Sequence, residues 1–150
     1  MRIYIDTSVI GGYFDEEFKE WSKRLIDEFK IGKKTVIISD VTLGELEDAP
    51  KHVRELIGTI PEKQKEIVLL DDEARELSSL YIKEKIVTPK SLLDTRHIAI
   101  ATINRADILV SWNFKHIVNL AKIRLYNAVN LKYGYPLLEI RSPMEVIYGK

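Results

Sequence analysis

The 150-residue chain carries 23 basic and 23 acidic residues, which balance to a formal net charge of zero, and it contains no cysteine. The length suits one domain, and we expect residues 1–150 to form it. The charge balance argues against binding nucleic acid or a membrane by bulk charge alone, and the absence of cysteine excludes disulfides and thiolate metal sites.

The first predicted element is a buried strand that begins at residue 2. Its apolar, β-branched residues end abruptly in Asp6, Thr7 and Ser8, and a turn into a helix follows. Because this strand starts so early, there is no room for a signal peptide, and no apolar run approaches the length of a membrane span. We therefore expect a cytoplasmic protein with no membrane partner.

The later elements alternate between helices and strands. Apolar spacing and capping residues predict helices at 15–30, 41–46 (after a cap at Ser39 or Asp40), 50–57, 72–81, 91–105, 114–120 and 121–127, with a break at Asn119, and a last helix that begins at Pro143. Apolar runs predict strands at 35–38, 67–70, 107–111 and 137–140. This alternation predicts a three-layer α/β/α sandwich with a mostly parallel central sheet.

Asp6 follows the first strand directly. Side chains at the carboxyl end of such a strand face the crevice in which α/β sheets bind their ligands. Asp6 is therefore either a functional carboxylate or the N-cap of the next helix.

Glu45 and Asp94 are carboxylates aligned with apolar helix faces. Glu45 lies four residues after Val41 on the same helix face. It is either a site carboxylate or a residue at the rim of the core that pairs with a surface lysine. Asp94 shares a helix face with His97. It is either a site carboxylate or part of a capping box with Ser91.

Ser111, Trp112 and Asn113 end the strand that follows the Asp94 helix. Asn113 is either a site residue or the N-cap of the next helix, and Trp112 is expected to pack. His97 is expected to be a satisfied core histidine, and His116 a solvated helical residue.

The three acids can converge at one sheet edge, with Asn113 beside them. They offer hard oxygen ligands and no sulfur, which suits Mg²⁺ or Mn²⁺. A divalent ion would also relieve the repulsion between clustered carboxylates and let them bind a phosphodiester.

The sequence resembles the PIN-domain ribonucleases, including the VapC-like toxins of toxin–antitoxin pairs. The likeness covers the whole chain and is carried by four motifs: residues 5–8, residues 38–46, Leu93-Asp94 with His97-x-Ala99-x-Ala101, and residues 109–113. Asn113 departs from a common aspartate of the family, although one subgroup shares the run Ser-Trp-Asn-Phe-Lys-His.

The resemblance implies a metal-dependent endoribonuclease that cleaves single-stranded RNA. Asp6, Glu45 and Asp94 would hold Mg²⁺ or Mn²⁺, largely through water, and Asn113 would complete the catalytic set. Further roles would fall to Thr7, Ser8 and Ser111 in positioning water or phosphate, and to Lys90, Arg96 and Lys115 in contacting the RNA backbone.

The expected partners are RNA, a small antitoxin protein and a second copy of the chain. One rival interpretation is a catalytically weak RNA-binding or protein-interaction module, which Asn113 favours. Another is an α/β phosphatase with Asp6 as nucleophile, although the phosphatase families considered need a second acid where this chain has Ser8.

Overall fold

A five-stranded sheet forms the centre of the computed structural model, which describes residues 1–148. The strand order is β3-β2-β1-β4-β5, and every neighbouring pair is parallel. The strands are β1 (Arg2–Ile5), β2 (Thr35–Ser39), β3 (Lys65–Val68), β4 (Ile108–Val110) and β5 (Glu139–Arg141). The predicted α/β sandwich is confirmed, and its sheet is parallel throughout the described residues.

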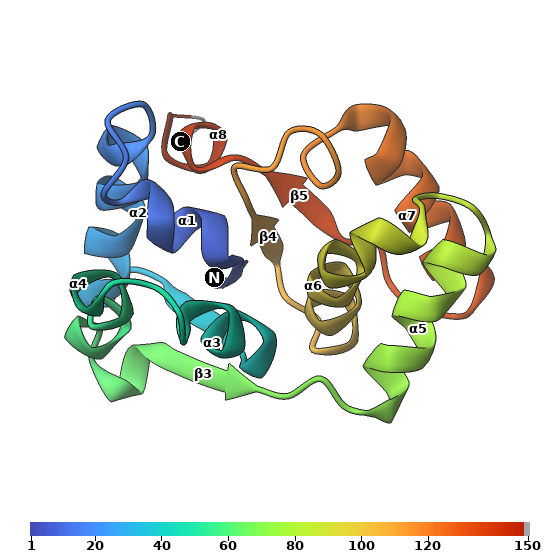
Figure 1. Cartoon of the computed structure of the whole chain (residues 1–150), viewed down its shortest axis with the longest axis horizontal. Helices are drawn as coiled ribbons and strands as arrows, with labels where there is room; N and C mark the ends of the chain where they lie inside the picture. The colour runs from blue at the N-terminus through green and yellow to red at the C-terminus, as the bar shows by residue number, and fades with distance from the viewer. Residues whose placement is uncertain (149–150) are drawn as a thin grey trace.

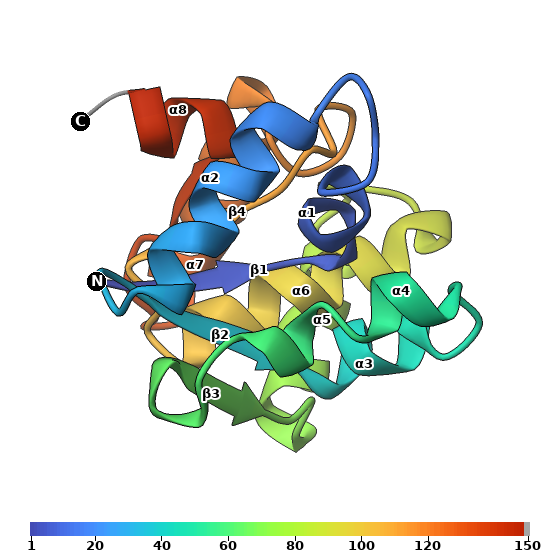
Figure 2. The same ribbon diagram turned by 90° about the vertical axis from the view of Figure 1, so that its left-hand side faces the viewer.

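Helices cover both faces of this sheet (Figures 1 and 2). They are α1 (Thr7–Gly12), α2 (Lys19–Lys30), α3 (Asp40–Leu46), α4 (Lys51–Arg54), α5 (Asp72–Lys83), α6 (Leu92–Ile103), α7 (Leu120–Lys132) and α8 (Pro143–Tyr148), with short 3₁₀ turns η1 (Ile57–Thr59), η2 (Glu62–Gln64) and η3 (Pro89–Ser91). In Figure 1, α5, α6 and α7 gather on one side, and α2 lies beside α8 in Figure 2. In the described part of the chain, no helix is both long and apolar enough to cross a membrane.

The alternation of side chains along the strands gives the sheet two separate cores. Tyr4 lies directly opposite Ile37 on one side and Leu109 on the other, and all three face the core shared with α5, α6 and α7. Ile3 and Ile5 face the other core, which contains residues of α1, α2 and η1. Because both faces are covered, the three central strands β1, β2 and β4 are apolar on both sides, as the sequence predicts.

Two predicted helices begin or end elsewhere. The helix predicted from residue 15 begins at Lys19, because the Asp15 carboxylate accepts the backbone N–H of Glu17 and forms a turn. The helix predicted over 50–57 is only one turn, α4, and it is followed by η1.

The helix predicted over 114–120 is wrong. The backbone N–H groups of Ile117 and Val118 both donate to the carbonyl of Asn113, at 3.1 and 2.8 Å, and so close a single turn. The break predicted at Asn119 is confirmed, since its side chain accepts the N–H of Lys122 and caps α7. Helix α7 then runs to Lys132, five residues further than predicted.

Candidate functional site

Polar residues follow three neighbouring strands at their carboxyl ends. Asp6 comes directly after β1, Ser39 is the last residue of β2, and Ser111 comes directly after β4. Strand β1 lies between the other two, where the strand order reverses direction along the sheet. Crevices that bind ligands form at such switch points in parallel sheets.

Asp6 is buried here, with only 4% of its surface exposed. Its Oδ1 accepts the N–H of Ser8 at 3.1 Å and the Ser8 hydroxyl at 2.6 Å, while its Oδ2 accepts the Ser111 hydroxyl at 2.6 Å. Burial raises the pKa of Asp6, and this effect outweighs the nearby His97 and the hydrogen bonds that oppose it. The capping alternative is realised, because Asp6 is the N-cap of α1.

The hydroxyls of Ser8 and Ser111 hold the two strand ends together. Besides donating to Asp6, Ser8 Oγ accepts the N–H of Trp112 at 2.9 Å, and Ser111 Oγ accepts the N–H of Asn113 at 2.9 Å. Each hydroxyl has one proton to donate. Both protons are therefore used to fix the carboxylate of Asp6.

Glu45 lies on α3, and 31% of its side chain is exposed. Its Oε1 accepts hydrogen bonds from His97 Nε2 at 2.7 Å and from the Thr7 hydroxyl at 3.0 Å. Burial alone would raise the pKa of Glu45, but His97 and Thr7 outweigh it and lower this pKa. The alternative of a rim residue paired with a lysine is wrong, since the partner is a histidine from α6.

Tyr4 connects Glu45 to the core through His97, a role that the sequence did not reveal. The Tyr4 hydroxyl lies 2.6 Å from His97 Nδ1 and 2.7 Å from Ser39 Oγ, and both Tyr4 and His97 are buried. When the imidazole is neutral, Nε2–H donates to Glu45, Tyr4 donates to Nδ1, and Ser39 donates to Tyr4, so every donor has one acceptor. The prediction that His97 is a satisfied core histidine is confirmed, and the same bond fixes the position of Glu45.

Asp94 lies half-buried in the first turn of α6. Ser91 makes no side-chain capping bond, so the capping box is not formed. Instead, Asp94 Oδ1 accepts the Asn113 amide Nδ2 at 3.3 Å. Burial raises the pKa of Asp94, the nearby His116 and His97 lower it, and the charges of Asp6 and Glu45 raise it further. Asp6 and Glu45 are therefore both close enough to act electrostatically on Asp94.

Asn113 caps a turn, as one of its alternatives predicts, and its amide also contacts Asp94. Its Oδ1 accepts the backbone N–H groups of Lys115 and His116, at 3.2 and 2.9 Å, while its Nδ2 faces Asp94. It caps a single turn and also orients a carboxylate of the candidate site.

The donor set is suited to a hydrated divalent ion. Within residues 1–148, no three Asp, Glu, His or Cys side chains are arranged to hold an ion between them directly. However, none of the described residues donates a hydrogen bond to Glu45 Oε2 or Asp94 Oδ2. Two carboxylate oxygens therefore remain for water, and Mg²⁺ commonly keeps several waters when it binds to protein carboxylates.

The three basic residues expected to contact RNA differ in exposure. Lys90 in η3 and Lys115 in the turn after Asn113 are exposed. Arg96 is partly buried on α6, and its Nε has no hydrogen-bond partner among the described residues.

Trp112 packs, as expected. Its ring stacks on Phe18 with centroids 4.3 Å apart, and its Nε1 donates to Ser22 Oγ at 2.9 Å. Gly12 permits this contact, because a Cβ there would lie 2.7 Å from both Ser22 Oγ and Trp112 Nε1. His116, by contrast, is not a solvated helical residue but a half-buried one in the turn, and its Nδ1 is buried.

Replacing Tyr4 by phenylalanine tests the connection from Ser39 to Glu45. The loss of the hydroxyl leaves His97 Nδ1 and Ser39 Oγ without their buried partner, so we expect a loss of about 1–3 kcal/mol in the free energy of unfolding. Denaturant unfolding of both proteins measures this loss. Tyr133→Phe, which changes an exposed tyrosine directly after α7, is the matched control and should cost almost nothing. Equal stability of Tyr4→Phe and the parent would show that the connection contributes nothing to folding.

Known proteins with the same fold and a matching family model identify the family of this chain. Three similar solved structures are the VapC20 toxin of Mycobacterium tuberculosis, described as a sarcin-ricin loop cleaving toxin, VapBC2 of Rickettsia felis bound to a DNA fragment from its promoter, and FitAcB of Neisseria gonorrhoeae. Their identities to this chain are 14%, 16% and 13%, with TM-scores of 0.58, 0.55 and 0.59. The matches cover 75%, 95% and 94% of this chain and 91%, 98% and 97% of the other chains, respectively.

At these identities the likeness concerns the fold. A comparison with curated proteins found no significant match. The family model of the PIN domain matches residues 3–117, a span that contains every acid of the candidate site. The chain therefore belongs to the PIN domain family.

Proposed function

We propose that this protein is a metal-dependent endoribonuclease that cleaves single-stranded RNA and serves as the toxin of a toxin–antitoxin pair. The observation that carries the proposal is the gathering of three carboxylates at one edge of the sheet. Asp6 follows β1, Glu45 lies on α3 directly after β2, and Asp94 accepts a hydrogen bond from Asn113, which follows β4. Membership of the PIN domain family supports a nuclease. The similar VapC20 is described as a toxin that cleaves the sarcin-ricin loop, and VapBC2 is described as bound to DNA from its promoter.

In this proposal the three acids hold one Mg²⁺ or Mn²⁺, largely through water. Such an ion, when bound, lowers the pKa of water and neutralises charge that develops on the phosphate. Asp94 Oδ2 and Glu45 Oε2 provide the oxygens that face this water, since their other oxygens accept hydrogen bonds from Asn113 and His97. Asp6 supplies the buried negative charge.

The remaining side chains orient these acids or contact RNA. Thr7, Ser8 and Ser111 donate to the carboxylates of Glu45 and Asp6, and in this way position the water and the phosphate. Exposed Lys90 and Lys115, with Arg96, contact the RNA backbone. We place the protein in the cytoplasm, where RNA and an antitoxin partner are available.

Incubation of the purified protein with unstructured RNA tests the proposal. We expect cleavage with Mn²⁺ or Mg²⁺ and none with a chelator. Binding of RNA without cleavage under any divalent ion would instead favour the weak module, the rival that Asn113 supports. Cleavage that persists in the chelator would rule out metal dependence.

We also propose a homodimer, although the aromatic residues of the early helices are used inside the fold and do not support it. Phe29 is buried, and Phe18 stacks on Trp112. Three exposed leucines of α7, Leu120 and Leu131 on one side of the helix and Leu125 on another, are apolar side chains that a second copy could cover. Light scattering should show a dimer that persists on dilution and dissociates in Leu125→Lys, whereas a monomer at every concentration would contradict it.

A further inference from the structure

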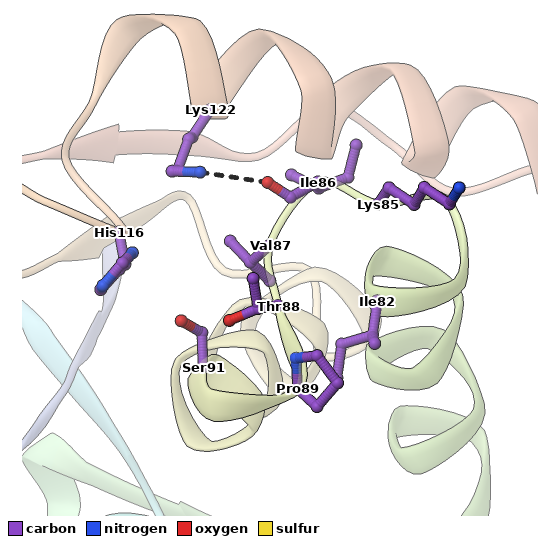
Figure 3. A pocket seen from close by; sticks show the side chains of 9 residues that line it. All are labelled: Ile82, Lys85, Ile86, Val87, Thr88, Pro89, Ser91, His116 and Lys122. Carbon is purple, nitrogen blue, oxygen red and sulfur yellow. Dashed lines mark hydrogen bonds between the residues drawn. The ribbon is translucent and has the colours of Figure 1, made fainter.

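A pocket of about 470 Å³ lies between the end of α5, the loop that follows it and the start of α7. This volume is within the usual range of small-ligand sites, about 300–1,000 Å³. Figure 3 shows the aliphatic side chains of Ile82, Val87 and Pro89 on one side and His116 on the other. The hydroxyls of Thr88 and Ser91 point into the space between them (Figure 3).

This pocket adjoins the candidate site through both of its polar walls. Ser91 lies one helical turn before Asp94, at the N-terminus of α6. His116 donates its backbone N–H to Asn113 Oδ1 at 2.9 Å, and the amide of Asn113 donates to Asp94 Oδ1 at 3.3 Å. A molecule in the pocket would therefore lie beside the carboxylates.

The lining has the chemistry that a nucleotide requires. It includes Lys85, Lys122 and His116 but no acid, and its other members are apolar residues and hydroxyls. Lys122 Nζ donates to the carbonyl of Ile86 at 3.1 Å, which fixes the ammonium group and leaves two of its three protons for a ligand. His116 Nδ1 is buried and has no hydrogen-bond partner among the described residues.

An unpaired RNA base needs an apolar surface for its ring, polar groups for its edge and a cation for its phosphate. The aliphatic wall, the hydroxyls with His116, and Lys122 offer these three features in one place. We propose that this pocket, the base pocket, receives one unpaired base of the RNA, next to the phosphate that is cleaved. The inference rests on the proposed function, for which it defines where the substrate strand lies.

The test uses the full-length protein, a chelator and single-stranded RNA oligonucleotides in which one nucleotide at a time is abasic. Binding is measured by fluorescence anisotropy. We expect one abasic position to weaken binding to the parent protein by about tenfold, because the contact of a single base is lost. Without divalent ions, the measurement does not depend on cleavage.

Thr88→Trp fills the base pocket with a new ring. Thr88 is exposed and makes no side-chain capping bond, so the fold should tolerate the change. The variant should bind intact RNA about tenfold more weakly and should no longer respond to the abasic position. Ser79→Trp, on the exposed face of α5 and outside the lining, is the matched control and should behave as the parent.

A second pair of variants tests the phosphate contact. Lys122→Met should weaken RNA binding, whereas Arg124→Met removes the same charge from an exposed position of α7 outside the lining and should have a smaller effect. Thermal unfolding shows whether the loss of the bond to Ile86 has altered the fold.

The outcomes separate this inference from the proposed function. Base-dependent binding that Thr88→Trp abolishes, in a protein that never cleaves RNA, supports the base pocket and rejects the nuclease. Cleavage together with equal abasic responses in Thr88→Trp and Ser79→Trp keeps the nuclease and overturns the base pocket. The latter result would leave the pocket to a side chain of a protein partner.

Discussion

Replacing Asp94 by asparagine should lower the rate of RNA cleavage at least about 100-fold and leave the fold intact. Mutating a residue that only hydrogen-bonds to a metal ligand commonly lowers metal affinity or activity about 10–100-fold. We propose Asp94 as a ligand itself, so its effect should be at least as large. Its Oδ1 accepts one hydrogen bond, from Asn113, and an asparagine oxygen can accept the same bond. The substitution therefore removes charge and preserves shape.

Asp48→Asn is the matched control, because Asp48 is exposed and lies outside the interacting acids. It should cleave RNA at the parental rate. Thermal unfolding with added Mn²⁺ gives a second measurement: an ion at 100 times its Kd stabilises the folded state by about 2.7 kcal/mol, which Asp94→Asn should lose. Full cleavage by Asp94→Asn would remove Asp94 from the catalytic set.

Asn113→Asp should bind divalent ions about tenfold more tightly and lower the metal concentration that cleavage requires. An aspartate keeps the bonds to the N–H groups of Lys115 and His116 but places a second carboxylate 3.3 Å from Asp94 Oδ1. Two charges about 4 Å apart repel by about 1–4 kcal/mol at effective dielectric constants between those of water and the protein surface. A bound cation relieves this repulsion, because it attracts both carboxylates, and the additional charge therefore strengthens its binding.

The pH dependence of the metal-free variant follows from the direction of the Asp94 pKa. This pKa is already raised by burial, and a neighbouring charge raises it further. A carboxyl group whose pKa is higher in the folded state destabilises that state as the pH rises from its ordinary value of 3.8 through the raised value. The free energy of unfolding of Asn113→Asp should therefore equal that of the parent below this pH range and be smaller above it.

Calorimetric titration of Mn²⁺ into both proteins measures the affinity, and urea unfolding at several pH values measures the stability. Asn119→Asp is the control for a charge added elsewhere, because Asn119 Oδ1 accepts the N–H of Lys122 as the N-cap of α7 and an aspartate can accept the same bond. Identical Mn²⁺ affinity in Asn113→Asp and the parent would assign Asn113 to the turn alone.

The sequence predicts the central strands well because their own residues determine them. The β-branched runs around Ile3, Ile37 and Leu109 are buried on both faces, so apolar composition is a sufficient signal. Strand β3 begins two residues before the predicted run because it lies at the sheet edge, where Glu66 pairs with Arg2 at 2.7 Å. Nothing near Glu66 in the sequence indicates that partner.

The candidate site is predictable in part for the same reason. Asp6, Glu45, Asp94 and Asn113 follow strands or interrupt apolar helix faces, and their local pattern indicates polar positions in a crevice. The contacts of Tyr4 and His116 are different, because each depends on elements distant in the sequence. A tyrosine inside an apolar strand and a histidine after an asparagine turn are ordinary choices until the folded neighbours are known.

The central position of β1 sets the order in which the molecule can be completed during synthesis. Its first partner, β2, follows soon after it, whereas β4 is made much later, and the bond from Ser111 to Asp6 joins residues 105 positions apart. Asp94 is made before β4, but until the residues of β4 and those directly after it have left the ribosome, Asp6 lacks the Ser111 hydroxyl and Asp94 lacks the Asn113 amide. A growing chain therefore lacks the assembled candidate site until β4 has been made, and if the protein is the toxin we propose, an antitoxin already present has that interval in which to bind.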